Sequence, residues 1–182
     1  MSTTAPTSSL RERQAPLKAR YEADPASATF TTVVRSVTEG DDPTRVRIAT
    51  ATGVGPDDQE IAWDAEAHPY AGGTGDLACS GDLLLGSLAA CQEITLRMVA
   101  AAMGITLDEV DVRVEGDMDF RGTMGVDPET PVGYQAIRTI IRLKADAPED
   151  RLQRLIQRAE RYCVVNATLR QSPDMTTTVE VG

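Results

Sequence analysis

The stretch 80-SGDLLLGSLAACQEITLRMVAAAMG-104 decides the fold that we expect for this chain. Between Asp82, a favourable N-cap residue, and Gly104, a favourable C-terminal stop, it contains only helix-compatible residues and no proline. A helix of this length is about 30 Å long, which is the width of a small domain. Because its apolar residues fall on nearly every side, the pattern predicts a central helix that is buried all round.

One thiol, that of Cys91, lies inside this predicted helix, with Ser87 and Thr95 one turn to either side on the same face. Taken alone, a cysteine in a buried helix is more often a packing residue than a nucleophile. Strands of one face cover only one side of a helix. An apolar surface all round therefore predicts a homodimer in which a second copy covers the other side.

Length and composition limit the classes of protein to consider. The 182 residues suffice for one domain with a core, and the formal charge of −10 argues against nucleic acid and anionic membrane surfaces as partners. We expect neither a membrane span nor a signal peptide. Three scattered cysteines do not suit a secreted disulfide scaffold, so we expect a cytoplasmic protein.

The pattern of elements predicts an α+β fold with mostly antiparallel sheets packed around the central helix. Residues 1–27 predict a flexible N-terminal arm with room for one short helical turn, which either lies across a partner subunit or stays a disordered tail. Residues 28–182 predict a single domain. A second helix is expected from Pro148, and strands are expected over residues 28–37, 45–52, 60–65, 110–120, 134–145 and 175–181.

The loop between the third strand and the central helix contains Gly72-Gly73-Thr74-Gly75. It lacks the spacing and the lysine of phosphate-binding loops, so we interpret it as a plain glycine turn. His68, the single histidine, has no metal ligands beside it and is expected to have a turn or packing role. We therefore expect no metal and no bound cofactor.

Several segments resemble the OsmC/Ohr family, whose members are thiol peroxidases that typically act on organic hydroperoxides. SGDLLLGSLAACQEITLRMVA resembles the central-helix signature of that family, and ERYCVVNATL resembles its second-cysteine segment. HPYAGGTG and GDMDFRGTMGV resemble a longer-chain branch. The resemblance implies an intertwined homodimer with the central helices between two sheets.

Carried over residue by residue, the resemblance implies that Cys91 attacks the peroxide and that Cys163 resolves the product. Asp82 stands where many members have a glutamate, and we expect it to serve as a plain N-cap, to orient an activating arginine, or to do both. Val164 stands where the wider family often has a proline. The activating arginine has three candidates on the N-terminal strands, namely Arg35, Arg45 and Arg47.

The implied activity is the reduction of organic hydroperoxides, as part of an antioxidant response to oxidative stress. It would proceed through a Cys91 sulfenate and a Cys91–Cys163 disulfide that an external dithiol or a lipoylated protein reduces. Cys79 lies outside this scheme and is expected to be an inert packing residue. The alternative is a redox-silent homodimer of the same fold that binds a small ligand, in which the cysteines only pack.

Overall fold

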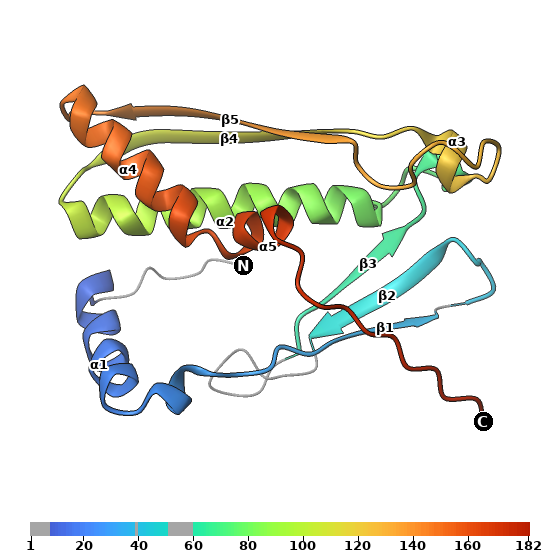
Figure 1. The fold of residues 1–182 in the computed structure, drawn as a ribbon, viewed down its shortest axis with the longest axis horizontal. Helices are drawn as coiled ribbons and strands as arrows, with labels where there is room; N and C mark the ends of the chain where they lie inside the picture. The colour runs from blue at the N-terminus through green and yellow to red at the C-terminus, as the bar shows by residue number, and fades with distance from the viewer. Residues whose placement is uncertain (1–7, 39, 51–59) are drawn as a thin grey trace. The chain divides into compact units, whose positions relative to one another are not determined.

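The computed structural model describes residues 8–38, 40–50 and 60–182 of the chain. These residues form two compact units, one made of the described residues up to Leu84 together with Gly116–Ala136, the other of Leu85–Glu115 and Ile137–Gly182. Each unit contains helical segments and strands (Figure 1). The predicted α+β class with antiparallel sheets and a central helix is confirmed, whereas the single domain over residues 28–182 stays a prediction. The last two residues of the strand predicted over residues 45–52 lie outside the described residues.

The first unit contains an antiparallel three-stranded sheet of β1 (Val34–Thr38), β2 (Arg45–Thr50) and β3 (Ala62–Glu66). This confirms the predicted antiparallel pairing, and the strands follow one another in the order β1-β2-β3. The first strand begins later than residue 28, because Pro25–Ala28 form the 3-10 turn η1, whose start the Asp24 side chain caps. The register places the charged residues of β2 and β3 opposite one another on one face, with Arg45 across from Glu66 and Arg47 across from Asp64.

The N-terminal arm contains more helix than the short turn that its composition suggested. Helix α1 (Leu10–Ala23) is fourteen residues long and begins with a reciprocal capping box between Ser9 and Glu12. None of its residues is buried. The capping-box pattern S-x-x-E therefore favours a helix here, although the arm has few apolar residues.

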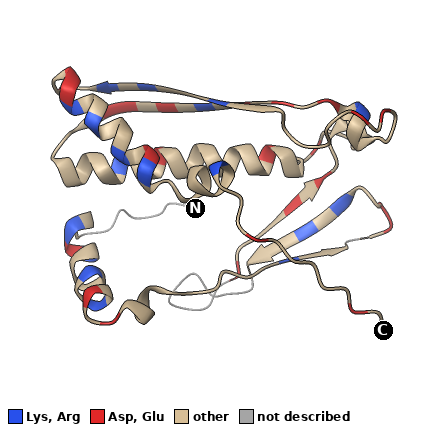
Figure 2. Ribbon diagram, viewed as in Figure 1, with Lys and Arg blue, Asp and Glu red and all other residues tan. Residues whose placement is uncertain are grey.

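The second unit contains most of α2 (Ser80–Met103), which packs against β4 (Leu107–Asp117), β5 (Ala136–Ala145) and α4 (Glu149–Tyr162) (Figure 1). A short helix that the sequence did not indicate, α5 (Val164–Arg170), follows α4. Charged residues alternate with others along β4 and β5, while α2 carries few charges (Figure 2). The buried core of this unit consists of Leu96, Ala100, Ile105, Leu155 and Ala159.

The start of α2 differs from the prediction and its end agrees with it. The helix begins at Ser80, so Asp82 lies in its first turn and is not the N-cap. At the other end Gly104 has a φ of 64°, and its N–H and that of Ile105 donate to the carbonyls of Ala101 and Ala100. This is the Schellman arrangement, for which a residue without a Cβ is best suited.

Burial of α2 is one-sided in the single chain, and burial all round, which needs a second copy on the other side, stays a prediction. Its buried residues recur every fourth position and form a single stripe of Leu88, Gln92, Leu96 and Ala100. On another side of the helix, Ile94 is 58% exposed. By length and composition α2 could also span a membrane, but the core helices of soluble proteins meet the same criterion.

Predictions for the later strands differ from the structure at one boundary and for one whole strand. β4 ends at Asp117 and not at residue 120, because the Asp119 side chain caps the short helix α3 (Phe120–Thr123). The last strand, predicted over residues 175–181, is not formed. Its apolar side chains, those of Met175, Val179 and Val181, are exposed. A strand requires a ladder partner, and none of the described residues pairs with this segment.

Candidate active site

Cys91 and Cys163 lie together in the second unit. Cys91 is in the fourth turn of α2, and Cys163 is the single residue between α4 and α5. Their side chains are joined by a hydrogen bond, and neither cysteine forms a disulfide. Cys163 is fully buried and Cys91 is half-buried. The fold thus brings together the two sulfur atoms that the sequence predicted as a pair.

Cys163 is positioned by the junction of two helices. Its N–H donates to the Ala159 carbonyl at the end of α4, and its carbonyl accepts from the Ala167 N–H in α5. Its own φ of −75° and ψ of 107° are extended, which breaks the helical path between them. The sulfur also accepts the Asn166 N–H at 3.5 Å, as an N-cap side chain does. Because of this break, the first turn of α5 faces Cys91.

Hydrogen-bond donors from two helices converge on the Cys91 sulfur. Burial raises the pKa of the Cys91 thiol, but the backbone N–H of Val165 and the side chains of Cys163 and Thr95 act against it, as does the backbone N–H of Val164. The net result is a pKa below the ordinary value for a cysteine. Since the thiolate is the nucleophilic form, this environment favours reactivity at Cys91.

Cys163 has the opposite environment. Burial raises the pKa of its thiol, the backbone N–H of Asn166 lowers it, and the contact with Cys91 raises it again. The net direction is upward. Of the two sulfurs, Cys91 is therefore the one that loses its proton more readily, while Cys163 retains its proton and donates it to the Cys91 sulfur.

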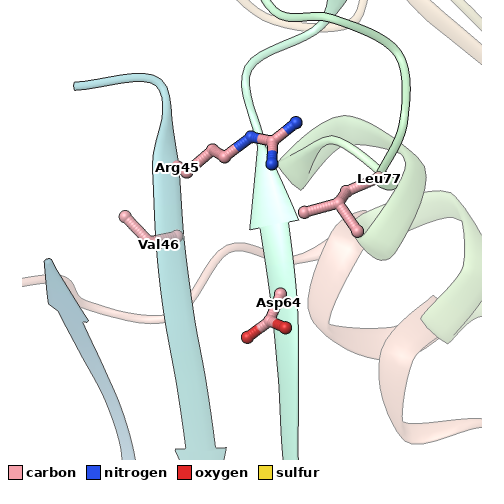
Figure 3. A pocket seen from close by; sticks show the side chains of 4 residues that line it. All are labelled: Arg45, Val46, Asp64 and Leu77. Atoms are coloured by element: carbon pink, nitrogen blue, oxygen red, sulfur yellow. The ribbon is translucent and has the colours of Figure 1, made fainter. Parts of the chain in front are cut away.

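The three candidate arginines belong to the first unit and lie on one face of its sheet. Arg45 forms ion pairs with Glu66 at 3.4 Å and Asp76 at 3.1 Å. Arg47 pairs with Asp64 at 3.1 Å. Figure 3 shows Arg45 and Asp64 beside a cavity of about 220 Å³ that they line together with Val46 and Leu77. That one of these arginines activates Cys91 stays a prediction.

The glycine loop surrounds a carboxylate that sequence reasoning missed. Glu66, at the end of β3, is buried and accepts hydrogen bonds from the backbone N–H groups of Gly75 and Leu77 and from the Thr74 hydroxyl. The Leu77 N–H leads a set of donors that outweighs the cost of burial and lowers the pKa of Glu66 to about 2. The loop is thus a turn that binds the chain's own carboxylate, and a single acidic residue at a strand end gave no signal of this.

Asp82 and Cys79 together begin α2. The Asp82 carboxylate accepts the Cys79 N–H at 3.0 Å, and the Cys79 sulfur accepts the Asp82 N–H at 3.4 Å. Cys79 is buried. This reciprocal pair satisfies backbone donors that the first turn of a helix leaves open. An additional role of Asp82 in orienting an arginine stays a prediction.

His68 has the turn and packing role expected of it. Its Nδ1 accepts the Tyr70 N–H at 3.1 Å and so caps the 3-10 turn η2 (Pro69–Ala71), while its ring stacks on Phe120 with the ring centres 4.8 Å apart. Within the described residues no group of three or more His, Cys, Asp or Glu side chains is arranged to hold a metal ion.

Comparisons with known proteins agree on one family. The sequence model of the OsmC-like proteins matches residues 73–178, which is more than half of the chain. No curated protein matches the chain in sequence.

Among solved structures, an OsmC-like protein from Mycoplasma pneumoniae is similar with a TM-score of 0.58 at 20% identity, over 79% of this chain and 89% of that one. An organic hydroperoxide resistance protein OsmC from Legionella pneumophila gives a TM-score of 0.56 at 19% identity, over 78% and 90%. One from Elizabethkingia anophelis gives a TM-score of 0.51 at 17% identity, over 79% and 91%.

Proposed function

This chain belongs to the OsmC-like protein family, and from that premise we propose that it reduces organic hydroperoxides, with Cys91 as nucleophile and Cys163 as resolving cysteine. Membership suggests a redox role of the peroxidase kind. Two proteins of similar fold are known as organic hydroperoxide resistance proteins, which supports this substrate class.

One observation carries the proposal: the hydrogen-bonded pair of Cys91 and Cys163, in which the pKa of Cys91 is lowered and that of Cys163 is raised. A peroxidase of this type needs a thiolate to attack and a nearby thiol to resolve. Cysteines that only pack have no need for donors gathered around one of them. The arrangement therefore favours the peroxidase over a redox-silent ligand-binding protein.

The reaction follows from these two environments. The Cys91 thiolate attacks the distal oxygen of ROOH, the O–O bond breaks, and the alkoxide takes up a proton and leaves as ROH. Cys91 is then a sulfenic acid. The Cys163 thiol, already in contact with that sulfur, condenses with it to a Cys91–Cys163 disulfide and releases water.

Return to the dithiol form requires two electrons from outside the chain. An external dithiol attacks the disulfide, forms a mixed disulfide and then closes its own disulfide as both cysteines are released. A lipoylated protein is one carrier of such a dithiol. Cys91 is the more exposed sulfur, because Cys163 is fully buried, so the attack falls on Cys91.

A homodimer belongs to the same proposal. The uncovered side of α2 includes small and apolar residues at helical spacing, namely Ala90, Ile94, Met98 and Ala101. The C-terminal segment has the alternation of a strand but no ladder partner among the described residues. A second copy of the chain would cover both features, since exposed apolar surfaces of this kind mark association sites.

Mass spectrometry of the reduced protein after one equivalent of cumene hydroperoxide tests the proposal. The expected product is a Cys91–Cys163 disulfide together with cumyl alcohol. Unmodified thiols and unconsumed peroxide would contradict it and favour the ligand-binding alternative. Treatment with hydrogen peroxide serves as the comparison, and we expect slower formation of the same disulfide because Cys91 lies among apolar residues of α2.

A further inference from the structure

We propose that Gln92 is a positioning residue for the resolving cysteine, and that its side-chain amide provides hydrogen bonds that hold the Cys163 sulfur ready to attack Cys91. The inference rests on the proposed function, because it concerns the second of the two steps proposed there. It assigns a role to a buried polar side chain that the proposed reaction leaves unused.

Gln92 is a polar residue in an otherwise apolar stripe of α2. It lies one turn from Leu88 and one turn from Leu96 on the buried side of the helix, and it is only 7% exposed. Its side-chain oxygen is buried and has no hydrogen-bond partner among the described residues. A polar atom that has lost water without gaining a partner destabilises the fold, so its presence in the core requires an explanation.

The packing of α4 against α2 relates the levels of the two helices. At the start of α4, the Arg151 guanidinium donates to the Met103 carbonyl at the end of α2, at 2.6 Å. Further along, residues of both helices meet in one buried cluster, namely Leu155 and Ala159 of α4 and Leu96 and Ala100 of α2. The helix α4 therefore runs from the end of α2 back toward its middle (Figure 1). One turn forward on α4 corresponds to one turn back on α2.

The next turn brings Cys163 to the level of Gln92, because Cys163 follows Ala159 by four residues and Gln92 precedes Leu96 by four. The N–H of Cys163 still donates to the Ala159 carbonyl, and its φ of −75° is close to helical. Its Cβ therefore continues the buried face of α4, and only its ψ of 107° departs from the helix. Both side chains are buried, so the amide and the thiol lie at one level of the core.

A fully buried sulfur needs hydrogen bonds before it can attack. The attacking form of a thiol is the thiolate, and burial disfavours that charge. The Asn166 N–H lies 3.5 Å from the Cys163 sulfur, which is a long hydrogen bond. A carboxamide suits both protonation states of the sulfur, since its oxygen accepts from the S–H and, after a half turn, its N–H groups donate to the thiolate.

The resolving step is balanced without a further reagent. The Cys163 sulfur bonds to the Cys91 sulfur while the S–O bond of the sulfenic acid breaks, so the Cys163 sulfur is oxidised and the Cys91 sulfur is reduced. The hydroxide that leaves takes up the Cys163 proton and departs as water. Gln92 exchanges no proton in this step and only holds the attacking sulfur.

The test follows this step without peroxide, in the full-length reduced protein treated with dithiobis(nitrobenzoate), an aromatic disulfide. Cys91 attacks the reagent and releases one thionitrobenzoate, and Cys163 then attacks the mixed disulfide at the Cys91 sulfur and releases the second. Stopped-flow absorbance measures both releases, and mass spectrometry identifies the Cys91–Cys163 disulfide as the product. Cys163→Ser should lose the second phase, which assigns that phase.

Gln92→Met keeps the length of the side chain and removes its hydrogen bonds. We expect the second phase to slow by roughly three- to tenfold at pH 7, and the midpoint of its pH dependence to rise by roughly half to one unit, while the first phase is unchanged. The melting temperature should not fall, because an unpaired buried oxygen is removed. Leu88→Met places the same side chain one turn earlier on the same stripe, and this matched control should change neither phase.

Charged groups on the neighbouring elements are the same in both variants. On α2, Glu93 and Arg97 pair with each other at 3.5 Å, and in the last turn of α4 the residues Glu160 and Arg161 are exposed. On α5, Arg170 donates to the Asn166 side chain at 3.3 Å. The side chains that β5 packs against the core are apolar, namely Ile141, Leu143 and Ala145. A shift seen only in Gln92→Met therefore belongs to the amide.

An unchanged second phase in Gln92→Met would overturn the inference, as would an equal slowing in Leu88→Met. If Gln92→Met does not fold, Gln92→Leu takes its place. A wild-type protein without a second phase would overturn both the inference and the proposed resolving step. A slowed second phase in a protein that does not consume cumene hydroperoxide would sink the proposed function and leave this inference standing.

Discussion

At the scale of single residues, the two cysteines of the pair differ because of their place on the backbone. Cys163 stands at a helix junction where burial is complete, so its thiol keeps its proton. Cys91 stands in mid-helix, where the dipole of its own helix gives little help, yet it faces the first turn of another helix. The two thiols thus differ in acidity, although one hydrogen bond joins them.

These characters predict different phenotypes for the two serine variants. Cys91→Ser should abolish the consumption of cumene hydroperoxide, because no other nucleophile occupies its place. Cys163→Ser should consume one equivalent rapidly and leave Cys91 as a sulfenic acid, and each further step of overoxidation should consume one more equivalent. A stopped peroxide assay with mass spectrometry of the Cys91 peptide measures both. Cys79→Ser is the control and should keep turnover, and equal residual activity in the first two variants would contradict the assigned roles.

At the scale of elements, the glycine-rich loop after β3 surrounds the buried carboxylate of Glu66 and donates hydrogen bonds to it. Two backbone N–H groups and one hydroxyl converge on Glu66, and Arg45 lies 3.4 Å from the same carboxylate. These hydrogen bonds require the backbone of the loop to lie close to the end of β3. A Cβ on Gly73 would lie 1.7 Å from the carbonyl oxygen of Ala67. Packing within the chain therefore requires glycine at position 73, while positive φ values of 93° and 87° favour it at positions 72 and 75.

Glu66 predicts an acid-sensitive contribution to stability. Its pKa is lowered from 4.5 to about 2 in the folded chain, so the stabilisation is fully present above about pH 4.5 and is lost as the pH falls through about 2. Glu66→Gln should lower the melting temperature at pH 7. In this variant the melting temperature should also fall less steeply than in the wild type as the pH drops from about 4.5 to about 2. Thermal unfolding followed by circular dichroism measures this, with Glu180→Gln in the exposed C-terminal segment as control. Parallel curves for wild type and Glu66→Gln would be inconsistent with the prediction.

The same loop predicts that one added methyl group at position 73 lowers the free energy of unfolding. Gly73→Ala should lower the free energy of unfolding by roughly 1–3 kcal/mol, because a backbone carbonyl must move to admit the Cβ. Gly86→Ala, in α2, meets nothing within 4 Å and should instead stabilise by about 0.5–1 kcal/mol. Urea unfolding of both variants checks the contrast, and a loss of the same size in both would argue against it.

At the scale of the whole molecule, surfaces left open in one chain point to a second copy. The buried stripe of α2 leaves Ile94 and Met98 exposed on the same helix. None of the α1 residues is buried in this chain either. An apolar helix that is covered on one side only is typical of a subunit interface.

Ile94→Asp should therefore convert a dimer into monomers, because a carboxylate would have to be buried in the interface. Sedimentation velocity at micromolar concentration measures the change. Val126→Asp is the matched control, since Val126 is 73% exposed and lies in the loop after α3. A monomeric wild-type protein, or a dimer that survives Ile94→Asp unchanged, would refute an interface at this side of α2.

Much of the fold could be predicted from local signals. The stop at Gly104, the alternation in β4 and β5 and the helix after Pro148 all depend on residues near one another in sequence, and each is found in the structure. The start of α2 was mistaken because the predicted N-cap, Asp82, instead binds the N–H of Cys79. The helix α5 was missed because a seven-residue helix has too few turns to show a period.

The sequence by itself determined the α+β class and the central helix, because periodicity and capping residues are properties of the chain alone, and its motif resemblance predicted Cys91 and Cys163 as the pair. Only the tertiary structure decided what surrounds the Cys91 sulfur. Thr95 lies on its own helix, but the N–H groups of Val164 and Val165 approach from more than seventy residues away in the chain. Backbone donors carry no side-chain signature. Their direction is set by how α4 ends and α5 begins, so they become visible only once the chain is folded.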